Sequence, residues 1–326
     1  MRGGVARYLS TLANFSGFDI SVVGPAQAKR RWWSAAWDLY KRRRSYDTIV
    51  VSHVLPIGTA AMLAGFLTGK PYMVIVHGMD VGIAKHHPIR RLVASLVLRR
   101  ARIVITNSKA LEREVLHDFK VSRCVTVYPP VVSPGSVAPE RVDTSDIRLL
   151  TVARLVPRKG HLRVLEALSL LRSSNPDLVI QYTIVGDGPM RDPIMQRIQD
   201  LRLQNVDIIT QADDDELNRL YATADLFVMP VIQDPADREG FGMVFLEAAA
   251  YGIPSIATDM AGVNEAILHG HTGILVPDGD ISSLADAIYQ MSVDSEFRGR
   301  LGNAAKQRVK DEYSPAAQFS KLSDFL

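Results

Sequence analysis

The sequence has very little cysteine and no long apolar run, and both absences limit what the protein can be. Cys124 is the single cysteine among 326 residues, so no internal disulfide can form and a reducing compartment is expected. No apolar run reaches the roughly 20 residues of a membrane-spanning helix, and the N-terminus lacks the apolar segment of a signal peptide. No spacing of histidine, cysteine or acidic residues demands a metal ion. We therefore expect a cytoplasmic protein without a metal site.

Charge is distributed unevenly along the chain. Residues 1–145 hold 21 of the 38 basic and 9 of the 35 acidic residues, a net charge of +12, and the remainder has a net charge of −9. The chain is also longer than one hydrophobic core usually supports, so two halves of opposite sign favour two domains. The basic half is expected to meet an anionic partner.

Tryptophan and arginine residues cluster between residues 29 and 44. Trp33, Trp37 and Tyr40 have helical spacing, which together with flanking basic residues is the pattern of a helix lying in a membrane interface. The predicted membrane patch consists of Arg30, Arg31, Trp32, Trp33, Trp37, Arg42, Arg43 and Arg44. A second basic segment covers residues 85–102. The alternative is an ordinary surface helix with solvated basic residues, and nucleic acid is disfavoured because no binding motif accompanies the charge.

The first half of the sequence alternates short apolar runs with helical patterns, which predicts parallel strands joined by crossovers. Gly3 and Gly4 form a turn into a helix, and His77 follows a strand, at the edge where parallel sheets bind ligands. A lone histidine there is more often structural than functional. Strands are predicted at residues 18–24, 48–52, 72–76, 103–106 and 125–128.

The same alternation restarts after a proline-rich linker at residues 128–147. Arg154 and Lys159 bracket the turn between a strand and the next helix, where two cations are well placed to hold a diphosphate. Asp280 is predicted to cap a helix that begins near residue 281, after a loop at 270–280. A last helix is predicted after residue 312, with Phe319, Leu322 and Phe325 on one face. Strands are predicted at residues 149–153, 182–185, 206–210, 226–229 and 255–258.

Residues 238–252 join a glycine-rich loop to an apolar helix. Gly240 and Gly242 allow a tight turn beside a ligand, and the free N–H groups at the following helix start suit a phosphate. Glu247 lies among apolar residues, where a carboxylate without hydrogen bonds would be costly. Sugar hydroxyls are natural donors to it. The alternative is that its side chain reaches solvent or caps a neighbouring backbone.

Taken together, these residues resemble the retaining glycosyltransferases of family 4. The resemblance runs along essentially the whole chain and is strongest from about residue 149 to residue 279. The matching features are the glutamates Glu239 and Glu247, the cations Arg154 and Lys159, the loops at 186–189 and 262–265, the glycine pair Gly3 and Gly4, and His77.

The resemblance implies an α/β chain with the GT-B fold, in which two Rossmann-like domains face each other across a cleft. It implies an acceptor-side domain at residues 1–143, a nucleotide-sugar-binding domain at 144–309, and a C-terminal helix at 310–326 that packs back toward the N-terminal domain. In the family a strand precedes the glycine pair, and here none does. We therefore expect a start site placed too late or a truncated copy, with activity in doubt if the chain is complete.

The resemblance also implies the reaction: transfer of a hexose from a GDP- or UDP-linked sugar to an acceptor, with retention at the anomeric carbon. The nucleotide-sugar is then a substrate, and no metal or other cofactor is required. The basic, tryptophan-rich segment, and not the resemblance, favours a membrane-associated or glycan acceptor and a cytoplasmic protein that lies on the inner face of the membrane. The implied roles are catalytic for His77 and Glu239, diphosphate binding for Arg154, Lys159, Gly3 and Gly4, ribose binding for Glu247, donor sugar and phosphate contacts for Gly240, Phe241, Gly242 and Met243, and a further donor-side loop for Gly186, Asp187 and Gly188.

Three alternative functions compete with this one. An epimerase on the same fold would bind nucleotide-sugars with related glutamates, although the basic aromatic helix favours a membrane-bound acceptor. A truncated, inactive nucleotide-sugar-binding protein would fit the absent first strand. A nicotinamide dehydrogenase is disfavoured because residues 186–188 lack the third glycine of that fingerprint.

Overall fold

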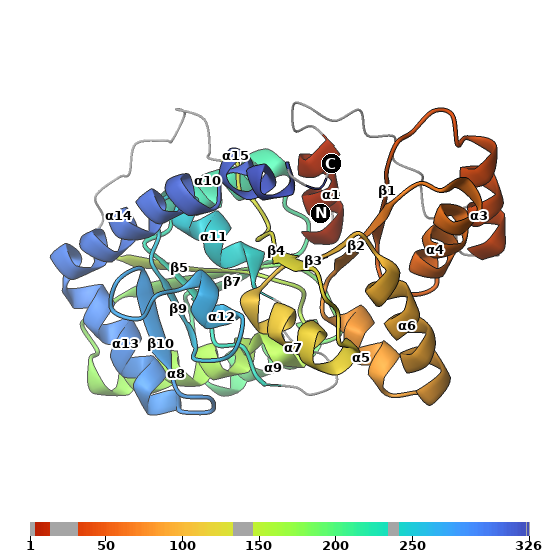
Figure 1. The fold of residues 1–326 in the computed structure, drawn as a ribbon. Helices are drawn as coiled ribbons and strands as arrows, with labels where there is room; N and C mark the ends of the chain where they lie inside the picture. The colour runs from red at the N-terminus through yellow and green to blue at the C-terminus, as the bar shows by residue number, and fades with distance from the viewer. Residues whose placement is uncertain (1–3, 14–31, 133–145, 234–240, 324, 326) are drawn as a thin grey trace. The chain divides into compact units, whose positions relative to one another are not determined.

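The structure is a computed structural model that describes residues 4–13, 32–132, 146–233, 241–323 and 325, in two compact units (Figure 1). The N-terminal unit comprises residues 4–130 and 315–326, and the C-terminal unit comprises residues 131–314. Each unit has its own parallel sheet with helices packed on it, so the α/β class predicted from the sequence is confirmed. The strand predicted at residues 18–24 lies outside the described residues.

Four parallel strands form the sheet of the N-terminal unit, in the order β1-β2-β3-β4. The central strand β2 has the sequence YMVIV and is buried along its whole length, as expected for a parallel strand covered on both faces. The four strands predicted from residue 48 onward are confirmed, with small shifts at their ends. Their bounds are Ile49–Ser52 for β1, Tyr72–Val76 for β2, Ile103–Thr106 for β3 and Cys124–Thr126 for β4.

Helices cover both faces of this sheet. Because successive side chains of a strand point to opposite faces, Met73 and Ile75 share one face, where they cluster with Tyr8 of α1 and Phe319 of α15. The opposite face packs against α4, α6 and α7. The bounds are Gly4–Ala13 for α1, Trp32–Lys41 for α3, Ile57–Thr68 for α4, Met79–Lys85 for α5, Pro88–Arg100 for α6, Lys109–Phe119 for α7 and Pro315–Phe319 for α15, which a 3-10 turn at Ser320–Leu322 follows.

The C-terminal unit has six parallel strands in the order β10-β9-β8-β5-β6-β7. The strands are β5 Ile147–Val152, β6 Ile180–Val185, β7 Val206–Ile209, β8 Leu226–Met229, β9 Ser255–Thr258 and β10 Gly273–Val276. The helices are α8 His161–Ser174, α9 Arg191–Asp200, α10 Asp214–Thr223, α11 Met243–Ala250, α12 Val263–Ala266, α13 Ile281–Val293 and α14 Ser295–Glu312.

One prediction for this unit is wrong and another is confirmed. Residues 270–280 were predicted to be a loop, yet β10 lies inside them and pairs in parallel with β9. Its first residue is Gly273, whose Cβ would lie 2.3 Å from the Ser255 carbonyl oxygen, so the close pairing excludes a side chain at this position and shortens the apolar run that marks a strand. Asp280 caps α13 as predicted, because its side chain accepts a hydrogen bond from the N–H of Ser283.

A helix that crosses a bilayer must be both long and apolar. None of the helices there is both long enough and apolar enough to cross a bilayer.

Candidate active site

The order of the strands reverses between β5 and β8 in the C-terminal unit. From β5 the chain continues to β6 and β7 on one side, and it then returns to β8, β9 and β10 on the other side. Open parallel sheets bind ligands at the carboxyl ends of the strands beside such a reversal. The segments that follow β5 and β8 are therefore the place where a ligand site is expected.

These two segments are in direct contact. The N–H of Ile232 donates to the carbonyl of Arg158 at 2.7 Å. Gly160 has a φ of 71°, and a Cβ at this position would lie 2.0 Å from the carbonyl oxygen of Pro230, so no side chain fits. The absence of a side chain at Gly160 thus lets the backbone after β5 approach the backbone after β8.

The two predicted diphosphate-binding cations lie on the segment after β5. Arg154 is exposed, whereas Lys159 ends a 3-10 turn that begins at Pro157 and is only 7% exposed. A lysine that is nearly buried keeps its charge only in polar or anionic surroundings. Both residues therefore lie beside the strand reversal. Arg154 is at the protein surface and Lys159 is buried.

The predicted donor-side loop at residues 186–188 follows β6 and packs on the same segment. The N–H of Leu155 donates to the carbonyl of Asp187 at 3.0 Å, and the N–H of Met190 donates to the carbonyl of Leu155 at 2.9 Å. A Cβ on Gly186 would lie 1.9 Å from the Ala153 carbonyl oxygen, so this glycine also permits a close approach of two backbones. The structure therefore brings together two segments that are about 30 residues apart in the sequence.

Helix α11 begins directly after Gly242, at the end of the segment that follows β8. Met243 is its first residue, and Phe241 just before it is buried. The first N–H groups of a helix have no partner inside the helix, so this end of α11 can bind an anion.

Glu247 lies one turn into α11 and is partly exposed. Its Oε2 accepts a hydrogen bond from the hydroxyl of Tyr221 on α10 at 3.1 Å. The ring of Tyr221 stacks on that of Tyr251, with centroids 5.4 Å apart. The carboxylate is thus held in place by a protein donor that sequence reasoning missed.

In the N-terminal unit, His77 directly follows β2 and its Nε2 lies 2.7 Å from the hydroxyl oxygen of Ser52 at the end of β1. Burial lowers the pKa of His77 to about 4, and His53 acts in the same direction while Asp80 opposes it. The imidazole is therefore neutral near pH 7. Tyr8 of α1, the helix that Gly4 begins, lies edge-on to the His77 ring with centroids 6.3 Å apart.

Another histidine that the sequence analysis did not single out lies beside the candidate site. His161 is the first residue of α8 and is buried, and its Nε2 lies 3.5 Å from the Arg154 carbonyl oxygen. Burial lowers the pKa of His161 to about 4. Its position directly after Gly160 was the only available signal in the sequence.

The aromatic helix α3 exposes much of its tryptophan surface. Trp32, Trp33 and Trp37 are 39%, 52% and 55% exposed. Trp37 stacks on Tyr40 with centroids 5.4 Å apart, and the Arg43 guanidinium lies 4.6 Å from the Tyr40 ring centroid. Arg42 and Arg44 of the predicted membrane patch follow this helix and are also exposed.

Five of the predicted functional residues lie outside the described residues, and their roles stay predictions. They are Gly3, Arg30, Arg31, Glu239 and Gly240.

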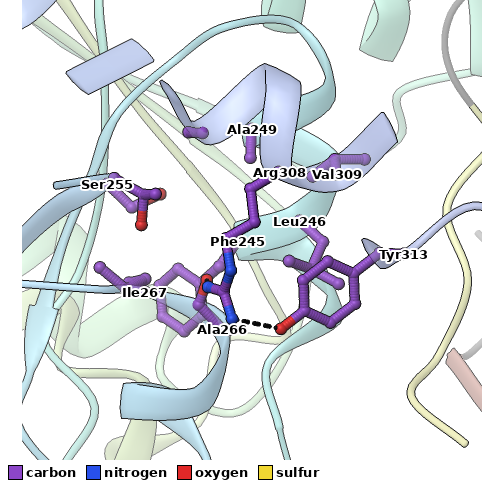
Figure 2. Close-up of a pocket in the computed structure, with 11 residues that line it drawn as sticks. Phe245, Leu246, Ala249, Ser255, Ala266, Ile267, Arg308, Val309 and Tyr313 are labelled. Carbon is purple, nitrogen blue, oxygen red and sulfur yellow. Dashed lines mark hydrogen bonds between the residues drawn. The ribbon is translucent and has the colours of Figure 1, made fainter. Parts of the chain in front are cut away.

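A small pocket in the C-terminal unit lies among α11, α12 and α14 (Figure 2). Arg308 and Tyr313 point toward each other in it, and the guanidinium donates to the tyrosine hydroxyl oxygen at 2.7 Å. Both side chains also donate to the Glu265 carbonyl, at 2.9 Å each. These contacts hold the predicted donor-side loop at residues 262–265 in place. We therefore assign the polar side chains of this pocket a role in positioning that loop.

Within the described ranges, no group of three or more histidine, cysteine, aspartate or glutamate side chains is arranged to hold a metal ion.

Solved structures with a similar fold include a glycosyltransferase from Rickettsia africae ESF-5, with a TM-score of 0.75 at 20% identity over 99% of this chain and 92% of that chain. HepE from Anabaena, solved in complex with UDP, superposes with a TM-score of 0.76 at 20% sequence identity, over 89% of this chain and 81% of that chain. Sucrose-phosphate synthase from Thermosynechococcus elongatus has a TM-score of 0.75 at 21% identity, over 95% and 81% of the two chains. At these identities the likeness concerns the fold alone, and it confirms the predicted GT-B class.

Sequence comparison shows the family directly. A GDP-mannose-dependent α-(1-6)-phosphatidylinositol monomannoside mannosyltransferase from Mycolicibacterium smegmatis is 27% identical over 293 residues, which are 86% of this chain and 76% of the relative. The glycosyl transferase 4-like domain matches residues 7–131, and the family of glycosyl transferases group 1 matches residues 136–308. Membership of this family implies a nucleotide-sugar donor. The chain belongs to the group 1 glycosyltransferases.

Proposed function

We propose that this protein is a retaining glycosyltransferase that transfers a hexose from a GDP- or UDP-linked sugar to a membrane-associated or glycan acceptor. Residues 144–309 form the donor-binding domain in this proposal, and residues 1–143 form the acceptor-side domain. Residues 310–326, which hold the end of α14, the short helix α15 and a 3-10 turn, are the segment that returns to the latter in this proposal. The two candidate nucleotides come from the relatives, one of which is named for GDP-mannose, while HepE was solved with UDP.

The observation that carries the proposal is the convergence of positive charge at the strand reversal. Arg154 and Lys159 follow β5, and the N-terminal end of α11 follows β8, whose segment bonds to that of β5 through Ile232 and Arg158. Breaking the bond between a sugar and a nucleoside diphosphate places negative charge on the leaving diphosphate. Cations and free backbone N–H groups that are already in place stabilise such a charge without reorganisation.

Glu247 is proposed to hold the ribose of the donor. A carboxylate can accept several hydrogen bonds, and Glu247 accepts one from Tyr221. The side chain is partly exposed, so two adjacent ribose hydroxyls can also donate to it. The tyrosine contact restrains the carboxylate before the donor arrives, which reduces the entropy lost on binding.

His77 and Glu239 are proposed to contact the transferred sugar near the reacting carbon. The low pKa of His77 keeps its imidazole neutral, so it acts through hydrogen bonds and not through charge. Gly3, Gly4, Gly186 and Gly188 are proposed to let backbone groups approach the donor.

The membrane patch on and around α3 is proposed to place the enzyme next to a lipid-linked acceptor. Its tryptophans are about half exposed, and Arg42, Arg43 and Arg44 follow them at the surface. Tryptophan prefers the interface between water and lipid, and arginine is attracted to anionic headgroups.

A donor screen tests the proposed function. Purified protein is incubated with UDP-, GDP- and ADP-sugars, and release of the nucleoside diphosphate is measured with and without membrane extract. We expect release from a GDP- or UDP-sugar, stimulation by the extract, and a product whose anomeric proton coupling shows retention. Release of free sugar isomers without an acceptor would favour an epimerase, and no release from any donor would contradict the proposal.

Matched variants connect this activity to the site. Lys159→Met removes the charge while keeping a long side chain, and it should reduce the release of diphosphate at least tenfold, about 1.4 kcal/mol in the barrier. Lys310→Ala removes an exposed charge from the end of α14 and should leave the rate unchanged. Equal rates in the two variants would show that the Lys159 charge plays no part.

A further inference from the structure

The ends of strands β1 and β2 bring a serine and a histidine into contact in the N-terminal unit. Ser52 is the last residue of β1 and is in register with Ile75 of β2, two residues before His77. Figure 1 shows the two strands side by side. The Ser52 hydroxyl oxygen lies 2.7 Å from Nε2 of His77. Either atom can be the donor in this bond, so the neighbours must decide where the proton is.

The neighbouring residue His53 favours the Ser52 hydroxyl as the donor. Nδ1 of His53 lies 2.5 Å from the Ser52 carbonyl oxygen, and a carbonyl can only accept, so this nitrogen carries a proton. The same Nδ1 lies 3.4 Å from the Ser52 hydroxyl oxygen, which it can approach only as a donor. The hydroxyl hydrogen of Ser52 is then free to point to Nε2 of His77. In that arrangement Nε2 of His77 accepts the hydrogen bond, and the proton of the neutral ring is on Nδ1.

The backbone around these residues is held by several bonds. His53 has a φ of 95°, which is rare for a residue with a side chain and persists only where the surroundings fix it. Its N–H donates to the Ile75 carbonyl at 2.9 Å. The Asp80 carboxylate accepts from the N–H of Val54 at 3.1 Å and from the N–H of His77 at 3.0 Å. One carboxylate thereby ties the residues after β1 to those after β2.

The two ring nitrogens of His77 differ in their contacts. In the described part of the chain, Nδ1 of His77 makes no hydrogen bond, whereas Nε2 is bonded to Ser52. An N–H donor on Nδ1 is therefore available to a hydroxyl or carbonyl oxygen of a bound molecule.

We propose that Ser52 is a positioning residue that fixes His77 as the tautomer with its proton on Nδ1, so that His77 offers an N–H donor to the transferred sugar. The chain of donors runs from His53 through Ser52 to His77. The tautomer itself follows from contacts within one unit, whereas the consequence for the sugar rests on the proposed function.

Nitrogen NMR of the histidine rings tests the tautomer without any donor or acceptor. Long-range proton–nitrogen spectra at pH 7 distinguish a protonated ring nitrogen from an unprotonated one. We expect His77 with a protonated Nδ1 and an unprotonated Nε2. In Ser52→Ala we expect a shift toward the tautomer protonated on Nε2, and in Ser52→Thr we expect the wild-type spectrum. A wild-type His77 protonated on Nε2 would overturn the proposal, and this result does not depend on how the variants fold.

The rate of diphosphate release from the donor found in the screen above gives a second readout. Ser52→Ala should lower kcat about tenfold with little change in the KM of the donor, and Ser52→Thr should restore most of kcat. Loss of kcat in both variants, or an unchanged kcat in Ser52→Ala, would contradict the positioning role. If the wild-type protein releases nothing from any donor while its His77 spectrum is as expected, the proposed function fails and the tautomer assignment stands.

Discussion

The hydroxyl of Tyr221 on α10 donates to the carboxylate of Glu247 on α11 at 3.1 Å. The two helices are joined through β8, so this bond links the helix before that strand to the helix after it. Tyr221 stacks on Tyr251, and the Tyr251 hydroxyl donates to Asn218, also on α10, at 2.8 Å. The Glu247 carboxylate, which is proposed to bind ribose, is therefore held by Tyr221, and Tyr221 is in turn packed against Tyr251.

Removing this restraint should weaken donor binding. Tyr221→Phe keeps the stacked ring and removes only the hydroxyl, so we expect a donor KM about fivefold higher, which corresponds to roughly 1 kcal/mol for one hydrogen bond, and little change in kcat. Tyr289→Phe, which removes an exposed hydroxyl on α13, is the control and should leave both constants unchanged. An unaltered donor KM in Tyr221→Phe would show that the bond does not matter for binding.

Two histidines make stability depend on pH. Burial lowers the pKa of both His77 and His161 from 6.5 to about 4. The unfolded chain therefore binds more protons than the folded chain between these values, and the free energy of unfolding falls as the pH drops from 6.5 toward 4. Each histidine contributes a slope of up to about 1.4 kcal/mol per pH unit.

Urea unfolding at several pH values between 7 and 5 measures this slope. His161→Gln removes one of the two groups and should reduce the slope by about half, because no ionising side chain remains at this position. The comparison uses slopes and not absolute values, so a general loss of stability in the variant does not affect it. A slope that is the same in the wild type and the variant would argue against burial of a neutral His161.

The sequence predicted the strands well because their signals are local. Runs of β-branched residues between turns marked β1 to β9, with errors at the ends only, whereas β10 was missed because a glycine starts it and loops surround it. The helix cap at Asp280 and the helix start after Gly242 were also predicted from neighbouring residues. Patterns within about ten residues of one another were thus sufficient for most of the fold.

The parts of the candidate site that depend on tertiary contact were not predictable in this way. Nothing near Glu247 in the sequence indicates Tyr221, and nothing near His77 indicates Ser52, because each partner arrives on another element. Arg154 and Lys159 were predicted from their place at a turn between a strand and a helix, yet their difference in burial required the structure. Local patterns locate the strand ends, and packing decides which side chains meet there.

Two glycines with the same backbone conformation should respond differently to alanine. Gly160 and Gly69 both have a φ of 71°, but a Cβ on Gly160 would lie 2.0 Å from the Pro230 carbonyl oxygen, while a Cβ on Gly69 would meet nothing within 4 Å. Gly69→Ala should therefore cost only the backbone strain, about 1 kcal/mol. Gly160→Ala adds a clash at the contact between the segments after β5 and β8 and should cost at least ~3 kcal/mol. Chemical denaturation checks this, and equal losses would contradict the contact.

Vesicle binding should depend on the tryptophans of α3. Replacing Trp32, Trp33 and Trp37 together by alanine should reduce sedimentation with phosphatidylglycerol vesicles at least tenfold, because each ring contributes apolar area to the interface. The matched control replaces three similarly exposed apolar residues of the C-terminal unit by alanine, Leu170, Met195 and Val293, which are 44%, 40% and 57% exposed.

Salt separates the two contributions to this binding. The attraction between the arginines at 42–44 and anionic headgroups is screened by salt, because the Debye length falls from about 10 Å at 0.1 M to about 3 Å at 1 M. Burial of the tryptophan rings in the lipid is not screened by salt. Binding that remains at high salt should therefore be lost in the tryptophan variant, and binding at low salt should fall when Arg42, Arg43 and Arg44 are replaced by serine. If the tryptophan variant sediments as the wild type does at both salt concentrations, α3 does not insert. The exposed rings would then have to be explained by a protein partner or by residues of the chain outside the described ranges.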